Sequence, residues 1–138
     1  MKILITNPPN LEKILSAGLS PDLRKTVFTF GDTIYNPGGN LISQALLKHE
    51  ETHSKQQGDD PNGWWDKYLK DTHFRLNQEI EAYQIQYKEL KKLVKDKNKL
   101  FTLLRLLAKD LSGEMYKNLL SLEEAQDKIK NENSTIKQ

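Results

Sequence analysis

The sequence predicts an α+β fold that is mainly helical, with a small antiparallel β-hairpin near the N-terminus. Three observations support this. Two short runs of β-branched and aromatic residues flank Gly31-Asp32, helical periodicity dominates the chain after residue 41, and 138 residues suffice for one modest core. We therefore expect a single domain over residues 1–130 and a flexible polar tail over residues 131–138.

The composition narrows the possible functions. The chain has no cysteine, so any metal must be bound by imidazole and carboxylate groups. The net charge is +2, with 21 basic and 19 acidic residues interspersed, which argues against a nucleic-acid partner. The apolar stretch at residues 1–6 is too short for a signal-peptide core or a membrane span, so we expect a cytoplasmic protein without a membrane partner.

The N-terminal part is expected to contain short elements. Gly18 and Pro21 end a first helix, and Gly31-Asp32 forms the turn of the hairpin. The expected elements are a strand over Lys2–Thr6 that extends the sheet, a helix over Leu11–Leu19, and hairpin strands over Thr26–Phe30 and Thr33–Tyr35.

The rest of the chain is expected to be helical. The predicted helices cover Leu41–Gln57, about Trp65–Lys95, and Leu100–Leu111, and a last one starts at the capping box Ser121–Glu124. The third of these is apolar on nearly every face, which favours a central position. The pair Trp64-Trp65 has two interpretations, a plug in the core or a wall of a groove, and the plug is favoured.

The segment from His49 to His53 has the pattern HExxH. Positions i and i+4 share one face of a helix, so both imidazoles can reach one ion, and Glu50 projects beside it. Zinc lowers the pKa of a bound water to near neutrality, and Glu50 would take the proton of that water as general base. The alternative is that His49 and His53 are hydrogen-bonded histidines on a half-buried helix.

A catalytic zinc site needs a third protein ligand. The candidates are Glu79, Glu81 and His73. Glu79 shares its stripe with Leu76 and Tyr83, whereas Glu81 has polar neighbours on its face. Because burial of an unpaired carboxylate is costly, the sequence favours Glu79 as the ligand, and His73 is the reserve.

At these residues the chain resembles the gluzincins, zinc metallopeptidases in which HExxH is followed by a second helix that bears a Glu, with a small residue three positions later. Glu79 and Ala82 match this spacing. A closer resemblance is to small bacterial HExxH domains of toxins and phages, which have a T-x-G-x-x-I pattern followed by L-L-x-H-E-x-x-H-x-x-Q-Q. Residues 29–34 and 46–57 match it, within a resemblance that covers about residues 26–83.

The resemblance implies a minimal zincin-like fold, in which one helix carries HExxH, a second long helix carries the third ligand, and an upstream edge strand lines the cleft. It suggests that Thr33–Tyr35 could bind an extended peptide by strand addition, although an ordinary hairpin strand is equally compatible with the sequence. Larger relatives have an acid four residues after the third ligand that supports a zinc-binding His. This chain has Tyr83 there, so that hydrogen bond must come from the phenol or from elsewhere.

No motif identifies the group that would stabilise the oxyanion of the reaction. Several side chains are chemically able to do so: Tyr35, Tyr68, His73, Arg75, Tyr87 and Tyr116. Among them we favour Tyr35 and Tyr116 as catalytic residues alongside Glu50.

These inferences lead to one functional hypothesis and two alternatives. The hypothesis is a zinc metallopeptidase with Zn²⁺ on His49, His53 and Glu79, which acts on a peptide or protein substrate and has no nucleic-acid partner. A monomer is the default expectation, since no feature of the sequence indicates the oligomeric state. The first alternative is a zinc-binding but catalytically weak accessory protein of phage or mobile-element origin. The second is a metal-free helical interaction domain that docks a partner through Leu100–Leu111.

Overall fold

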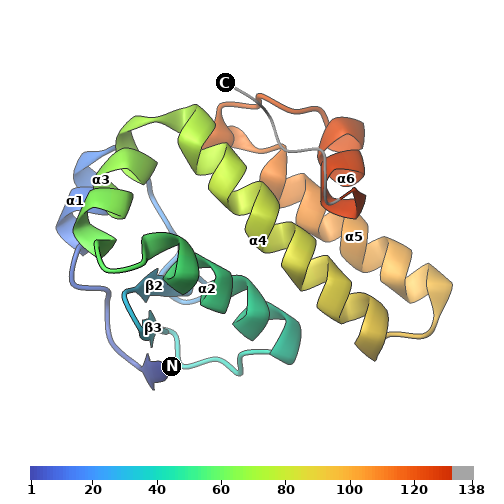
Figure 1. Cartoon of the computed structure of the whole chain (residues 1–138), viewed down its shortest axis with the longest axis horizontal. Coiled ribbons are helices and arrows are strands. Elements are labelled where there is room, and N and C mark those ends of the chain that lie inside the picture. The colour runs from blue at the N-terminus through green and yellow to red at the C-terminus, as the bar shows by residue number, and fades with distance from the viewer. Residues whose placement is uncertain (132–138) are drawn as a thin grey trace.

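The computed structural model describes residues 1–131 and is mainly helical, with a small mixed sheet (Figure 1). The predicted tail lies outside the described residues except for Asn131. The strands are β1 (Lys2–Leu4), β2 (Phe28–Phe30) and β3 (Thr33–Tyr35). The helices are α1 (Leu11–Ser16), α2 (Gln44–Gln57), α3 (Pro61–Lys70), α4 (Thr72–Leu93), α5 (Lys97–Leu111) and α6 (Leu122–Lys130), with a 3₁₀ turn, η1, at Glu114–Tyr116.

The sheet has the strand order β1-β3-β2. The hairpin is confirmed: β2 pairs antiparallel with β3, and Gly31 has a φ of +64° in the turn, a conformation that glycine adopts without steric cost. The N-terminal strand is confirmed too, but it is parallel to β3, so the sheet is mixed and not antiparallel throughout. The strand Thr33–Tyr35 is therefore central, with both edges already paired, and the suggestion that a peptide adds to it is wrong.

The outer edge of β2 is held by side chains of two helices. The backbone carbonyl of Thr29 accepts hydrogen bonds from Gln57 Nε2 at 2.8 Å and from Trp65 Nε1 at 2.9 Å. The backbone N–H of Gly31 also donates to Gln57 Oε1 at 2.6 Å. These contacts fasten the hairpin to α2 and α3, and so place Thr29 against the helix that carries HExxH.

The predicted helix from about Trp65 to Lys95 is two helices, α3 and α4. Asp71 separates them because its backbone is extended, with φ −114° and ψ 103°, and its carboxylate accepts a hydrogen bond from the backbone N–H of Phe74 at 3.0 Å. This is an N-cap, which starts a new helix. Pro61 at the first turn of α3 also moves the start of that helix four residues earlier than expected.

The helix α5 is amphipathic, so the prediction of burial on nearly every face is wrong. Leu104, Ala108 and Leu111 are buried, but Phe101 is 54% exposed and Leu106 is 53% exposed. The capping box of α6 is confirmed, with Ser121 Oγ accepting from the N–H of Glu124 at 3.1 Å and Glu124 Oε1 accepting from the N–H of Ser121 at 2.9 Å. No helix in residues 1–131 is both long and apolar enough to cross a membrane.

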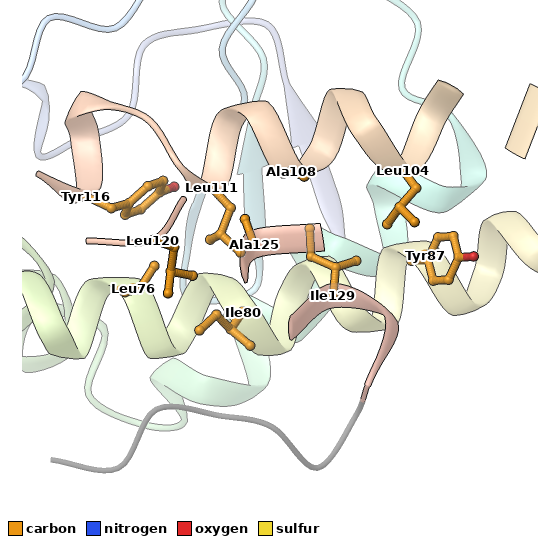
Figure 2. Packing of buried hydrophobic residues seen from close by; sticks show 10 residues of the cluster. All are labelled: Leu76, Ile80, Tyr87, Leu104, Ala108, Leu111, Tyr116, Leu120, Ala125 and Ile129. Carbon is orange, nitrogen blue, oxygen red and sulfur yellow. The ribbon is translucent and has the colours of Figure 1, made fainter. Parts of the chain in front are cut away.

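The buried apolar residues form two clusters. One joins α4, α5, η1 and α6 around fully buried Leu76, Ile80 and Leu111 (Figure 2). The other joins α1, β2 and α3 around Ile14, Phe28 and the pair Trp64-Trp65. The helix α2 lies between the sheet and α4 (Figure 1).

Candidate metal centre

His49 and His53 face inward from α2 on one side of the helix, as their spacing predicted, and Glu50 is buried beside them. Ser43 caps the helix by accepting a hydrogen bond from the N–H of Leu46 at 3.1 Å, so α2 begins at Gln44 instead of Leu41. His49, Glu50 and His53 are each 5% exposed. On α4, Glu79 is 7% exposed while Glu81 is exposed, which confirms that the two carboxylates lie on different faces.

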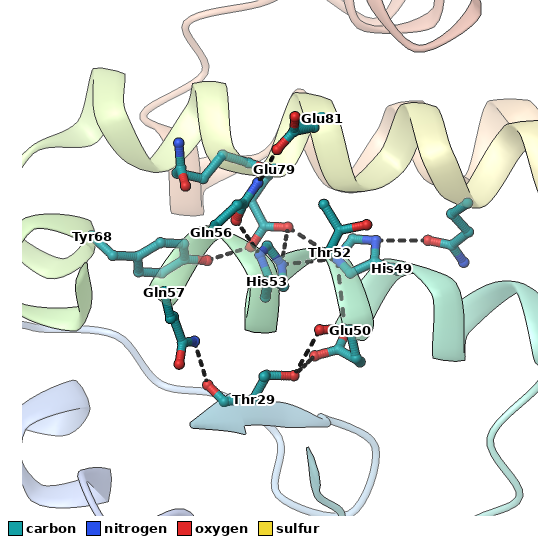
Figure 3. A network of polar contacts seen from close by, with 12 residues as sticks. Thr29, His49, Glu50, Thr52, His53, Gln56, Gln57, Tyr68, Glu79 and Glu81 are labelled. Atoms are coloured by element: carbon teal, nitrogen blue, oxygen red, sulfur yellow. Dashed lines mark hydrogen bonds and ion pairs between the residues drawn. The ribbon is translucent and has the colours of Figure 1, made fainter. Parts of the chain in front are cut away.

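Three side-chain atoms from the two helices form a small triangle (Figure 3). His49 Nε2 lies 3.1 Å from Glu79 Oε1, His53 Nε2 lies 3.0 Å from the same oxygen, and the two nitrogens are 3.2 Å apart. The identity of the third ligand remains a prediction, but Glu79, the favoured candidate, is within hydrogen-bond distance of both histidines.

The other ring nitrogen of each histidine contacts a glutamine oxygen. His49 Nδ1 lies 2.9 Å from Gln86 Oε1, and His53 Nδ1 lies 2.8 Å from Gln56 Oε1. An amide oxygen only accepts hydrogen bonds, so each Nδ1 carries a hydrogen. In the neutral form of each ring the lone pair is then on Nε2, directed at the triangle.

These lone pairs point at one another and at a carboxylate, so a positive species must lie between them. In the metal-free protein a proton fills this role. Burial alone would lower the pKa of His53, but the charge and hydrogen bond of Glu79 outweigh it and raise the pKa to about 9. Burial would raise the pKa of Glu79, but the charge of His53 and the hydrogen bonds of both histidines hold it well below its usual range.

Glu50 lies beside the triangle without joining it. Its Oε1 accepts a hydrogen bond from Thr29 Oγ1 at 2.8 Å, and its Oε2 lies 3.8 Å from His49 Nε2, beyond hydrogen-bond distance (Figure 3). Thr29 is 2% exposed, so the hydroxyl that holds Glu50 is excluded from bulk water. One carboxylate oxygen is thus anchored to β2, and the other faces the histidines.

The donor set fits a metal ion. The buried group His49, Glu50 and His53 could hold one, because its ligand atoms all lie within 4.8 Å of one another. Zinc bonds to nitrogen and oxygen of about 2.0–2.1 Å imply donor separations of about 3.3–3.4 Å in a tetrahedron. The separations of 3.0–3.2 Å among His49, His53 and Glu79 are within a few tenths of an ångström of that value.

The triangle lies in the wall of a cavity of about 740 Å³. Residues 18–21 and 25–29 line one side, and the end of α5 with η1 lines the other. The pair Trp64-Trp65 contributes to the wall and is also buried in the second apolar cluster, so both interpretations of these residues apply. A ligand in the cavity would therefore contact His49, Glu50, His53 and Glu79 directly.

The structure brings only some of the predicted residues to the cavity. Tyr116 and Tyr68 line it, and Tyr68 OH donates to Glu79 Oε2 at 2.5 Å. The remaining candidates are outside its lining: Tyr35 on β3, exposed His73, buried Arg75, which bonds backbone carbonyls of Tyr68 and Met115, and Tyr87 in the first apolar cluster. Of the two favoured oxyanion residues, Tyr116 is at the site and Tyr35 is not.

Tyr83 and Asp110 also line the cavity. The sequence indicated Tyr83 only as a support for a zinc-binding histidine, and it did not predict Asp110. Tyr83 has its ring 4.7 Å from that of His49 at an angle of 73°, and it interacts with Asp110, which also lines the cavity. Burial, followed by the charge of Glu79, raises the pKa of Tyr83 and of Tyr116 well above the usual value, so both phenols stay protonated. The hydroxyl of Tyr83 hydrogen-bonds to Asp110. The stripe of α4 contained Tyr83, but no local pattern marked Asp110.

Comparison of the chain with family models, with curated proteins and with solved structures found no match. The interpretation of the site therefore depends on its own geometry.

Proposed function

We propose that the protein is a zinc-dependent metallopeptidase in which His49, His53 and Glu79 bind the zinc and Glu50 is the general base. The observation that carries this proposal is the convergence of two Nε2 lone pairs and a carboxylate oxygen at 3.0–3.2 Å in the wall of a cavity. A structural cluster of histidines would not need to open onto a cavity large enough for a peptide segment.

The surroundings of the ligands support a hydrolytic role. A zinc ion bound there would lower the pKa of a coordinated water and polarise a substrate carbonyl. Glu50 faces the ligands with Oε2 while Thr29 holds its Oε1, which is the position that a general base requires. Tyr116 supplies a protonated phenol at the cavity wall for the developing oxyanion.

The variant Glu50→Gln tests the assignment of the base. The amide keeps the shape of the side chain but cannot take a proton, so peptide cleavage should fall by about 10²–10⁴-fold. Bound zinc, measured by elemental analysis of untagged protein, should stay at one per chain. Glu51→Gln, the same substitution at the next and partly exposed residue, is the matched control.

A digest of an unbiased peptide library, with and without a chelator, tests the activity itself. Chelator-sensitive cleavage by the wild type, lost in Glu50→Gln, is the expected result. Zinc binding without any cleavage would instead favour the accessory-protein alternative, and absence of zinc would favour the metal-free interaction domain.

A further inference from the structure

Each of the three proposed zinc ligands contacts a second, uncharged side chain. Gln86 Oε1 accepts from Nδ1 of His49, and Gln56 Oε1 accepts from Nδ1 of His53. On the third ligand, Tyr68 donates its hydroxyl hydrogen to Glu79 Oε2. None of the three partners belongs to the triangle, and none carries a charge.

We propose that Gln56, Gln86 and Tyr68 are positioning residues that fix the orientation of the ligands before a metal binds. This inference rests on the proposed zinc site and names the groups that preorganise it. Outer partners of this kind orient a ligating imidazole and select which nitrogen faces the ion. His49 Nδ1 is thus supported by Gln86 and not by Tyr83, whose ring packs edge-on against the His49 ring.

Gln56 has the best-defined orientation of the three. Its Nε2 donates to the backbone carbonyl of Gln78 at 2.9 Å and to Glu81 Oε1 at 2.8 Å, both on α4 (Figure 3). Rotation of the amide by 180° would place an oxygen against these two acceptors, so the amide oxygen must face His53. Glu81 thus acts on the site through Gln56, although it is exposed and does not reach the triangle.

Tyr68 is held as firmly by different contacts. Its side chain is 3% exposed, and its ring stacks on Trp64 at a centroid distance of 4.8 Å. Its backbone carbonyl accepts from Arg75 Nη1 at 2.6 Å. The hydroxyl therefore has little freedom, and it holds Oε2 of Glu79 so that Oε1 faces the two histidines.

The zinc affinity of the full chain, measured by competition with a chromophoric chelator, tests this proposal. Gln56→Leu, Gln86→Leu and Tyr68→Phe each remove one outer hydrogen bond and should weaken zinc binding by about 10–100-fold. Gln126→Leu is the matched control, because Gln126 accepts a hydrogen bond from Arg105 and neither residue lines the cavity. Unchanged affinity in all three folded variants would overturn the proposal.

A second measurement needs no variant. Ring ¹⁵N shifts of the zinc-loaded wild type should show Nδ1 protonated and Nε2 metal-bound in both His49 and His53. Coordination through Nδ1 of either ring would overturn the proposal. If the wild type binds no zinc, this inference and the proposed function both fail, whereas zinc binding with the expected shifts but without cleavage would remove only the peptidase.

Discussion

Thr29 is the only side chain outside α2 that is within hydrogen-bond distance of Glu50 in the described part of the chain. Thr29→Val keeps the shape of the residue and the two hydrogen bonds to its backbone carbonyl but removes the hydroxyl. Because Glu50 then loses its anchor, kcat of peptide cleavage should fall by about 10–100-fold. Steady-state kinetics with zinc at saturation would measure this.

The conservative variant Thr29→Ser distinguishes the orientation of Glu50 by the hydroxyl from a general effect of the substitution on folding. Serine keeps the hydroxyl and should retain most of the activity, while both variants should bind zinc as the wild type does, since Thr29 contacts no proposed ligand. A parallel loss of zinc in Thr29→Val, or equal activity of Val and wild type, would contradict the assigned role.

The inner residues of the site were predictable from the sequence and most of its outer residues were not. Spacing on a helix placed His49 and His53 together and separated Glu79 from Glu81. Thr29 and Gln86, by contrast, meet their partners across 21 and 37 residues of sequence. Such contacts depend on how α2 packs against β2 and α4, and the hydrophobic periodicity of the sequence does not reveal this packing.

The helices α2 and α4 contact each other through a series of polar pairs. Gln44 bonds Glu89 at one end, the histidines meet Glu79 and Gln86 in the middle, and Gln56 meets Glu81 towards the other end. The start of α2 meets the end of α4 at Gln44 and Glu89, and the end of α2 meets earlier residues of α4 through Gln56, so the helices run antiparallel. A buried interface of this kind is stable only when its polar groups are satisfied.

The cap that separates α3 from α4 is testable by Asp71→Ala. Loss of the hydrogen bond to the N–H of Phe74 should lower the free energy of unfolding by about 1 kcal/mol, as measured by urea denaturation. Asp59→Ala, at an exposed residue before α3, should change it by less than about 0.5 kcal/mol. Equal effects of the two substitutions would argue against the cap.

Two of the wrong predictions concern where a helix divides and how a strand pairs. The helical pattern is continuous from Trp65 to Lys95, so nothing in it indicated that a helix ends at Asp71. The sequence alone does not distinguish an aspartate inside a helix from one that caps a new helix. Likewise, the order of strands depends on where β1 pairs, which a strand of three residues does not reveal. The types of these elements were therefore predictable, but the break between α3 and α4 and the pairing partner of β1 were not.

At the scale of the whole molecule, the cavity separates two apolar clusters built on different helices. The cluster of α4 to α6 lies on one side, and that of α1, β2 and α3 lies on the other. The proposed ligands on α2 and α4 lie between them, and Tyr68 of α3 reaches Glu79 across the same boundary. A metal bound there would add a link between α2 and α4.

Zinc should therefore raise the thermal stability of the protein. Free zinc at 100 times its Kd should add about 2.7 kcal/mol to the free energy of unfolding, which corresponds to a rise in Tm of roughly 5–11 °C. Differential scanning calorimetry of zinc-loaded and chelator-treated protein would measure the shift. His53→Ala should show almost none, and a shift of the same size in that variant would place the metal elsewhere.

The carbonyl of Thr29 has a consequence for how a substrate would be selected. Its two lone pairs are already used by Gln57 and Trp65. An extended peptide lying along β2 could therefore not donate a main-chain hydrogen bond to the carbonyl of Thr29, the β2 residue that contacts Glu50. If the proposed peptidase activity holds, selection among peptide sequences would depend on the substrate side chains that enter the cavity.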